Sequence, residues 1–140
     1  MGCGKGKIWD KFPEIGPVKA KDIYTGTFSK KCVEYAEKFH PDSWRILSAK
    51  YGFMEGNDII LTPYNACFHI KNSNPISFEE LRDQAEDKEL NKYDKIVVLG
   101  GRYYTNLIKS VFPNKYVYNP LENCKGIGYM IRKLNNLLNH

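Results

Sequence analysis

Residues 44–64, Trp-Arg-Ile-Leu-Ser-Ala-Lys-Tyr-Gly-Phe-Met-Glu-Gly-Asn-Asp-Ile-Ile-Leu-Thr-Pro-Tyr, carry the strongest pattern in the chain. The apolar run 44–47 is typical of a buried strand, and it stops abruptly at residues 48–52, Ser-Ala-Lys-Tyr-Gly. Lys50 would then follow the carboxyl end of a strand, where ligands bind in α/β sheets. Gly52 can adopt a positive φ at no steric cost. Pattern alone leaves a second interpretation open, which is a strand, a loop and a strand with ordinary turn residues.

Length and composition set the class of protein. The 140 residues, of which 42% are hydrophobic, suit a single domain over residues 1–140. No apolar run approaches 18 residues and the first residues contain no apolar signal segment, so we expect no membrane partner and a cytoplasmic location. The four cysteines contain no Cys-x-x-Cys pair, and we predict neither a metal site nor a cofactor.

Strands and helices alternate along the chain. The run 94–99 is β-branched and continuous, as in a strand buried on both faces, and 115–118 forms a further strand. Apolar spacings of three and four predict helices that end near His40 and near Val111. They also predict a last helix, which residues 121–128 open and whose core stripe runs from Ile127 to Leu138. Ser77 opens a capping box that begins another helix, from about Phe78 to Leu90. This order predicts a three-layer α/β fold, with a largely parallel central sheet and helices on both faces.

Four glycine-containing loops fall at strand ends or helix starts. They are residues 2–7, 48–52, 100–104 and 119–128, and they contain the cations Lys5, Lys50, Arg102 and Lys125. If the fold is as predicted, these loops share one sheet edge and form a basic, glycine-lined cleft. Each loop also has a simpler interpretation, as a flexible terminus or as a tight turn. The predicted ligand-binding residues in these loops, with Tyr64, are Lys5, Ser48, Lys50, Tyr51, Gly52, Tyr64, Gly100, Gly101, Arg102, Tyr104, Lys125, Gly126 and Gly128.

The net charge of +5 favours an anionic ligand, a nucleotide or a nucleic acid. Lys50 and Arg102 would hold phosphate or developing negative charge. Three tyrosines, Tyr51, Tyr64 and Tyr104, are candidates for stacking on a base.

Two residues are candidates for catalysis. Asp58 is the carboxylate best placed to orient a water or to act as general base, although a turn residue after Gly56 and Asn57 is the interpretation that the pattern favours. Cys3 would act as nucleophile if the ammonium groups of neighbouring lysines favoured its thiolate.

Several motifs together resemble a family of small uncharacterised archaeal, bacterial and phage domains. These motifs are Cys3-x-Lys5, Tyr24-Thr25-Gly26-x-Phe28, Leu47 to Gly52, Pro63-Tyr64, Leu99-Gly100-Gly101 with Tyr104, Pro120-Leu121 and Gly126-Ile127-Gly128. The resemblance runs nearly end to end and adds Tyr24, Thr25 and Gly26 to the expected ligand-binding residues. Relatives usually have a strand before the cysteine motif, for which Met1 leaves no room. Either the fold lacks this first strand, or the reading frame starts too late.

The central part also resembles, more distantly, the YaaA peroxide-stress family, which is associated with DNA binding. Related α/β domains occur in archaeosine-type tRNA modification enzymes and resemble uracil-DNA glycosylases in fold. The resemblance implies nucleobase or nucleic-acid chemistry by analogy. Three hypotheses stay open: a base-modifying or glycosidase-like enzyme, a non-catalytic nucleotide or nucleic-acid binding module, and a structural or partner domain.

Overall fold

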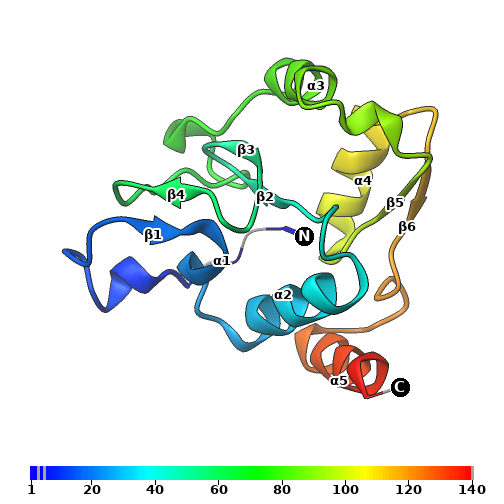
Figure 1. The fold of residues 1–140 in the computed structure, drawn as a ribbon, viewed down its shortest axis with the longest axis horizontal. Helices are drawn as coiled ribbons and strands as arrows, with labels where there is room; N and C mark the ends of the chain where they lie inside the picture. The colour runs from blue at the N-terminus through cyan, green and yellow to red at the C-terminus, as the bar shows by residue number, and fades with distance from the viewer. Residues whose placement is uncertain (3, 5, 140) are drawn as a thin grey trace.

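The protein has a mixed α/β fold, as the sequence predicts. The computed structural model describes residues 1–2, 4 and 6–139, and the predicted site residues Cys3 and Lys5 lie outside the described residues. Along the chain (Figure 1), the elements are η1 (Ile8–Asp10), β1 (Val18–Lys19), α1 (Ala20–Ile23), α2 (Thr27–Phe39), β2 (Ile46–Ser48), β3 (Gly52–Met54), β4 (Ile59–Ile60), η2 (Lys71–Ser73), α3 (Phe78–Asp87), η3 (Leu90–Lys92), β5 (Lys95–Val97), α4 (Arg102–Val111), β6 (Tyr116–Tyr118) and α5 (Ile127–Leu138).

The strands form three two-stranded sheets in the described part of the chain, and not the largely parallel central sheet that we predicted. β1 pairs with β4 and β2 with β3, both antiparallel, whereas β5 and β6 are parallel. A parallel pair needs a crossover of about a dozen residues or more. Only residues 49–51 join β2 to β3, so that pair can only be a hairpin. β5 and β6 are parallel because α4 lies between them in the chain.

The first two residues lie between β2 and the end of β5. Leu47 N donates to Met1 O at 2.7 Å, Gly2 N donates to Leu99 O at 3.2 Å, and Gly2 forms a parallel bridge with Leu47. The Met1 ammonium also donates to Arg45 O at 2.7 Å. Relatives usually have a strand before the cysteine motif, and in this chain Met1 and Gly2 lie in that position. They also connect the carboxyl end of β2 with that of β5.

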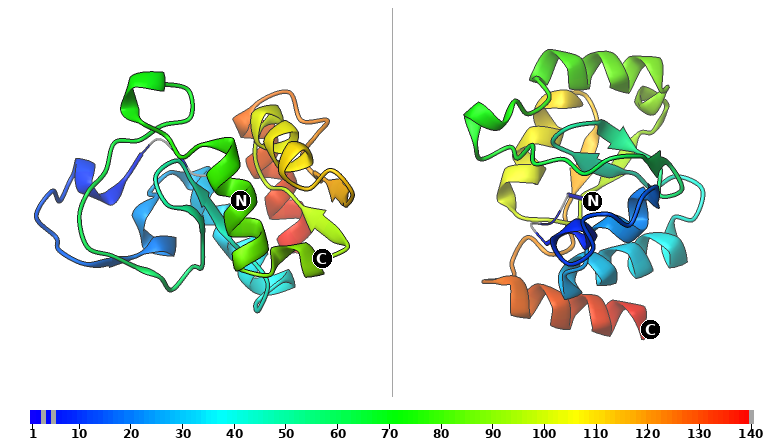
Figure 2. Two further views of the ribbon diagram at one scale, coloured as in Figure 1. Left: turned by 90° about the horizontal axis from the view of Figure 1, so that it is seen from above. Right: turned by 90° about the vertical axis from the view of Figure 1, so that its left-hand side faces the viewer.

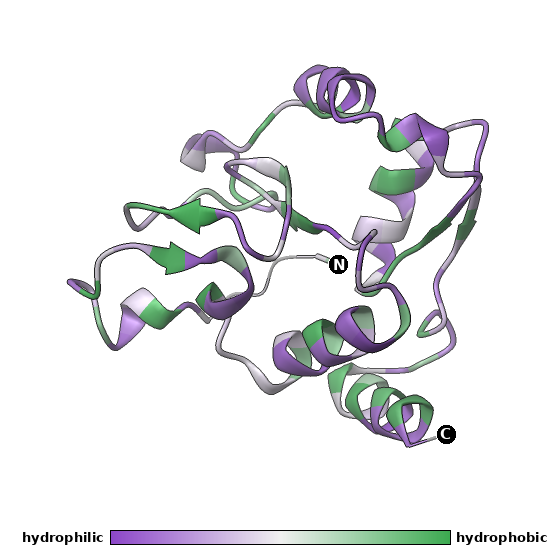
Figure 3. Ribbon diagram, in the orientation of Figure 1, coloured by the Kyte–Doolittle hydropathy of each residue, from purple (hydrophilic) through white to green (hydrophobic). Residues whose placement is uncertain are grey.

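Helices cover these strands from two sides. Figures 1 and 2 show α3 and α4 on one side and α2 and α5 on the other. Neighbouring strand residues enter different core clusters, because successive side chains of a strand point to opposite faces. Leu47, Phe53 and Val98 pack with α3 and α4. Leu99 packs with Cys32 of α2 and Leu134 of α5. A third cluster, around Ile46 and Met54, reaches β1 and β4. Figure 3 shows the apolar strands and the hydrophilic outer surface of α3.

The predicted helix boundaries are confirmed in most cases. The Ser77 capping box is present: Glu80 N donates to Ser77 Oγ at 3.1 Å, and Ser77 N donates to the Glu80 carboxylate at 3.4 Å. α3 ends at Asp87 and not at Leu90, because Glu89 has a φ of 58° and the chain continues as a 3-10 turn. No helix among residues 1–2, 4 and 6–139 is long and apolar enough to span a membrane.

Candidate ligand-binding site

The loop after β2 is a tight turn organised by Ser48. The Ser48 side chain is fully buried, and its Oγ accepts hydrogen bonds from the backbone N–H groups of Lys50 and Tyr51, each at 3.1 Å. Gly52, with a φ of +74°, pairs with Ser48 and closes the hairpin. A hydroxyl that bonds the backbone two and three residues on holds such a turn in one conformation. The turn leaves the Lys50 side chain exposed and half-buries Tyr51.

A short chain of buried hydroxyl groups begins at Ser48. Its Oγ donates to Tyr64 OH at 3.3 Å, and Tyr64 OH is hydrogen-bonded in turn to Tyr24 OH. Tyr64 is 6% exposed, and its ring packs edge to face against Trp9 and Tyr51, with centroid distances of 5.5 and 5.4 Å. The predicted stacking of Tyr64 on a base would therefore require this ring to leave an enclosed position.

Two lysine ammonium groups converge on Tyr64. Lys7 Nζ lies 5.4 Å from the centroid of the Tyr64 ring, and Lys50 Nζ lies 6.0 Å from the same centroid and 5.3 Å from that of Tyr51. These are cation–π distances. Among the described residues, neither ammonium group forms an ion pair with a carboxylate. We call Lys7, Tyr24, Ser48, Lys50, Tyr51 and Tyr64 the tyrosine–lysine cluster.

Sequence reasoning missed Lys7 as a site residue. Lys7 forms an antiparallel bridge with Tyr24, and Thr25 N donates to Gly6 O at 3.2 Å, which places the Lys7 backbone beside the start of α2. The alternation of glycine and lysine in residues 2–7 was the available signal. It did not identify which lysine would face Tyr64, because that depends on pairing with a segment 17 residues away in the sequence.

Trp9 adds an unusual polar group next to Tyr64. The Trp9 side chain is 7% exposed, and its indole Nε1–H has no hydrogen-bond partner among the described residues. A buried donor without an acceptor costs about 1–3 kcal/mol, and most buried polar groups in native proteins are satisfied. The Trp9 ring that packs against Tyr64 therefore carries a buried donor that no described residue satisfies.

The loops after β5 and β6 are joined by the Asn119 side chain. Asn119 Nδ2 donates to Gly100 O at 3.0 Å and to Thr105 Oγ1 at 2.9 Å, and thus joins the two loops. Gly2 donates to Leu99 O and lies against Tyr104, whose ring a Cβ on Gly2 would approach to 2.7 Å. Asn119 thus joins the loops after β5 and β6, and residues 1–2 bond to both β2 and the segment after β5. The cleft formed by four loops stays a prediction.

Other predicted residues lie at the starts of helices. Gly101 is the N-cap of α4, and Arg102 is exposed in its first turn. Thr25 and Gly26 are exposed at the start of α2. Lys125, Gly126 and Gly128 belong to the start of α5, and among the described residues no hydrogen bond or ring contact joins them to the tyrosine–lysine cluster.

Asp58 lies away from the tyrosine–lysine cluster. Its carboxylate accepts a hydrogen bond from Glu55 N at 2.9 Å, and its carbonyl accepts one from Ala20 N at 2.8 Å. Met54 pairs with Ile46, so the turn after β3 begins at the end of the hairpin opposite Lys50. These contacts fit the turn role that the pattern favoured, and they place the predicted general base at the wrong end of the hairpin for work beside Lys50.

The described cysteines have ordinary structural environments. Burial raises the pKa of the Cys32 thiol from 9.0 to about 12, against a smaller lowering by the N-terminal ammonium. Cys67 and Cys124 are half-buried. Within residues 1–2, 4 and 6–139, no three His, Cys, Asp or Glu side chains are grouped so that they could hold a metal ion.

An apolar cavity lies apart from the tyrosine–lysine cluster. It has a volume of about 160 Å³ and is lined mainly by apolar side chains, among them Leu47, Phe53, Ile108 and Phe112. Trp44 and Lys95, at the amino ends of β2 and β5, also line it. The predicted basic, glycine-lined cleft is not this cavity.

The fold and the site define a small mixed α/β protein with a tyrosine–lysine cluster at the carboxyl end of β2. The chain belongs to the family of unknown function DUF6884, whose model matches residues 2–136. It is 39% identical over 134 residues to the uncharacterized protein YfjM of Bacillus subtilis (strain 168), an alignment that covers 95% of this chain and 89% of that protein. No solved structure gives a significant match.

This family membership confirms the expected resemblance to small uncharacterised domains. Neither the family description nor the name of the relative carries a link to the YaaA family or to uracil-DNA glycosylases. That part of the resemblance stays an expectation.

Proposed function

We propose that the tyrosine–lysine cluster binds the phosphate of a nucleotide or nucleic acid. The observation that carries this proposal is the convergence of Lys7 and Lys50 on Tyr64 with no carboxylate partner among the described residues. Lysine ammonium groups bind phosphate as point charges. Ammonium groups that are not neutralised by a carboxylate keep a positive potential that attracts an anion.

Three further features are compatible with an anionic ligand. The chain has a net charge of +5, Arg102 is exposed at the start of α4, and the Tyr64 ring is fixed by its hydroxyl bonds to Ser48 and Tyr24. The hydrogen bonds of Met1 and Gly2 also support a finer proposal for the fold, in which β2, β5 and β6 belong to one largely parallel sheet. A cytoplasmic location, where nucleotides and nucleic acids abound, is part of the same proposal.

A binding module fits the observations better than a glycosidase-like enzyme. The resemblance to nucleobase-directed families supports an enzyme, but such an enzyme needs an acid or base placed at the ligand. Asp58, predicted for that role, lies at the other end of the hairpin and bonds to Glu55 N. The binding role requires only the lysines and the fixed tyrosines.

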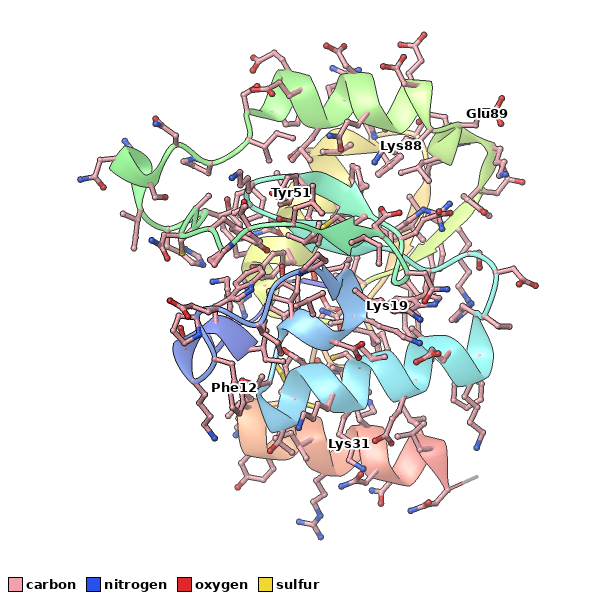
Figure 4. The ribbon with its side chains drawn as sticks, turned by 60° about the vertical axis from the view of Figure 1, so that its left-hand side comes forward. Phe12, Lys19, Lys31, Tyr51, Lys88 and Glu89 are labelled. Atoms are coloured by element: carbon pink, nitrogen blue, oxygen red, sulfur yellow. The ribbon has the colours of Figure 1, made fainter. Side chains whose placement is uncertain are left out.

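A titration of short single-stranded DNA, RNA and a nucleoside monophosphate tests the proposal. We expect Lys50→Ala to weaken binding about 10- to 100-fold at low salt, since hydrogen bonds to charged groups contribute about 1.5–3 kcal/mol. Lys31→Ala is the matched control, because Lys31 pairs with Glu34 at 3.4 Å and lies far from Tyr51 in Figure 4. Absence of binding by the wild type to all three probes, or equal losses in the two variants, would contradict the proposal.

A further inference from the structure

A group of aromatic side chains lies where the loop after Tyr64 meets the start of α4. The His69 and Tyr103 rings have centroids 4.7 Å apart, and Phe68 lies 5.8 Å from Tyr103. Tyr103 is 40% exposed and His69 is also exposed, whereas Phe68 is half-buried beneath them. Phe68 also contacts Tyr104 edge to face at 6.2 Å, which fixes the group against α4.

The loop that carries Phe68 and His69 is attached to the turn of Lys50. Ile76 N donates to Ala49 O at 2.6 Å, so the end of this loop bonds to the residue before Lys50. Ser73 holds the loop closed, because its Oγ accepts a hydrogen bond from Cys67 N at 2.9 Å and lies 2.5 Å from Ile70 O. The loop that carries two of the aromatic residues is therefore fixed to the turn that carries Lys50.

The charge around the aromatic group also suits a nucleic acid. Residues 65–77 and 100–111 contain no aspartate or glutamate, and they contribute Lys71, Arg102 and Lys109. An exposed aromatic surface without acidic neighbours and with cations beside it is the combination that binds single strands, in which each base has a π-face and each link carries a phosphate.

We propose that Tyr103 and His69 form the surface on which a nucleobase stacks, while its phosphate lies at the tyrosine–lysine cluster. This inference rests on the proposed function and adds where the base of the ligand binds. It assigns base stacking to residues other than the predicted Tyr51, Tyr64 and Tyr104. Tyr64 is enclosed, and the rings of Tyr51 and Tyr104 are half-buried and packed edge to face against neighbouring rings.

The test compares two probes that differ only in their bases. One is a single-stranded oligonucleotide of about ten nucleotides, within the usual site sizes. The other is an abasic strand of the same length, which keeps the phosphates and lacks the bases. We expect Tyr103→Ala to weaken binding of the oligonucleotide about 5- to 100-fold and to leave the affinity for the abasic strand unchanged. Tyr103→Phe, which keeps the ring, should bind both probes like the wild type.

Two controls separate this inference from the proposed function. Lys50→Ala should weaken binding of both strands. Tyr116→Ala removes an equally bulky ring, which is 62% exposed at the amino end of β6, and it should change neither affinity.

The outcomes separate the two proposals. If the wild type binds both strands and Tyr103→Ala weakens binding of both equally or not at all, the proposed stacking surface is wrong and the proposed phosphate site stands. If the wild type binds neither strand, both proposals fail. A nucleoside monophosphate in parallel shows whether a free nucleotide suffices.

Discussion

Gly52 is the residue on which the turn between β2 and β3 depends. Its φ of +74° lies in the left-handed region, and a Cβ there would lie 2.1 Å from Gln84 Oε1. We therefore predict that Gly52→Ala lowers the free energy of unfolding by about 2 kcal/mol, from backbone strain and from displacement of Gln84. Urea denaturation followed by circular dichroism measures this change.

Gly128→Ala is the control for that prediction. Gly128 lies in the first turns of α5, and a Cβ there would contact no other part of the described chain. Alanine is the better helix former, so this variant should be as stable as the wild type or up to about 1 kcal/mol more stable. Equal destabilisation by both substitutions would show that Gly52 has no special conformational role.

The Cys32 thiol should be chemically inert in the folded protein. Because burial raises its pKa to about 12, almost no thiolate forms near pH 8, whereas the half-buried Cys67 and Cys124 should react. Alkylation at pH 8 followed by peptide mass spectrometry measures each rate, and alkylation in denaturant gives the reference. Modification of native Cys32 as fast as Cys124 would contradict its placement in the core.

The same thiol makes stability depend on pH. The folded-state pKa lies above the ordinary value of 9.0, so its contribution to stability is complete below pH 9.0 and is lost as the pH rises toward about 12. Replacement of Cys32 by alanine should reduce the loss of stability over that interval, which denaturation at several alkaline pH values measures.

At the scale of elements, α3 supports β3 through its side chains. Gln84 Oε1 accepts a hydrogen bond from Phe53 N, and Gln84 Nε2 donates to Tyr51 O, both at 2.9 Å. Lys88, labelled in Figure 4, donates to Phe53 O. These bonds satisfy strand groups that no neighbouring strand among the described residues pairs with. α3 therefore completes the outer edge of the hairpin that presents Lys50.

We predict that Gln84→Ala destabilises the protein by about 2 kcal/mol, because two partly buried backbone groups lose their partners. It should also weaken oligonucleotide binding, since the turn of Lys50 is then less well held. Glu86→Ala, on the exposed face of the same helix, is the control and should change stability by less than about 0.5 kcal/mol. Thermal unfolding of both variants tests this, and equal melting temperatures would contradict it.

The sequence predicted individual helices and strands better than it predicted how the strands pair. The Ser77 capping box and the strand after Asp94 are local patterns, and both appear where they were expected. The pairing of strands was not predictable in the same way. β1 and β4 pair across 40 residues, and Met1 and Gly2 bond to Leu47 and Leu99, so these contacts depend on the whole fold. Helix periodicity carries no information about such partners.

At the scale of the whole molecule, the sequence predicted most residues of the tyrosine–lysine cluster but not all of them. Ser48, Lys50 and Tyr51 were identified because one short segment contains them, and Tyr64 because a proline–tyrosine pair follows the next strand. Lys7 and Tyr103 were missed, because their positions depend on contacts with Tyr64 and with the 65–76 loop. Asp58 lies at the end of the hairpin opposite Lys50 because β3, which the sequence pattern did not predict as a strand, reverses the chain before it.

The central claim is that Lys7 and Lys50 contact phosphate, and the salt dependence of binding tests it most directly. The association constant for a single-stranded oligonucleotide should be measured at several salt concentrations for the wild type, Lys7→Ala, Lys50→Ala and Lys31→Ala. Each phosphate contact on a single strand contributes about 0.7 to the slope of log association constant against log salt concentration. We predict that Lys7→Ala and Lys50→Ala each reduce the slope by about that amount and that Lys31→Ala does not. Slopes equal to that of the wild type in both variants would contradict the claim.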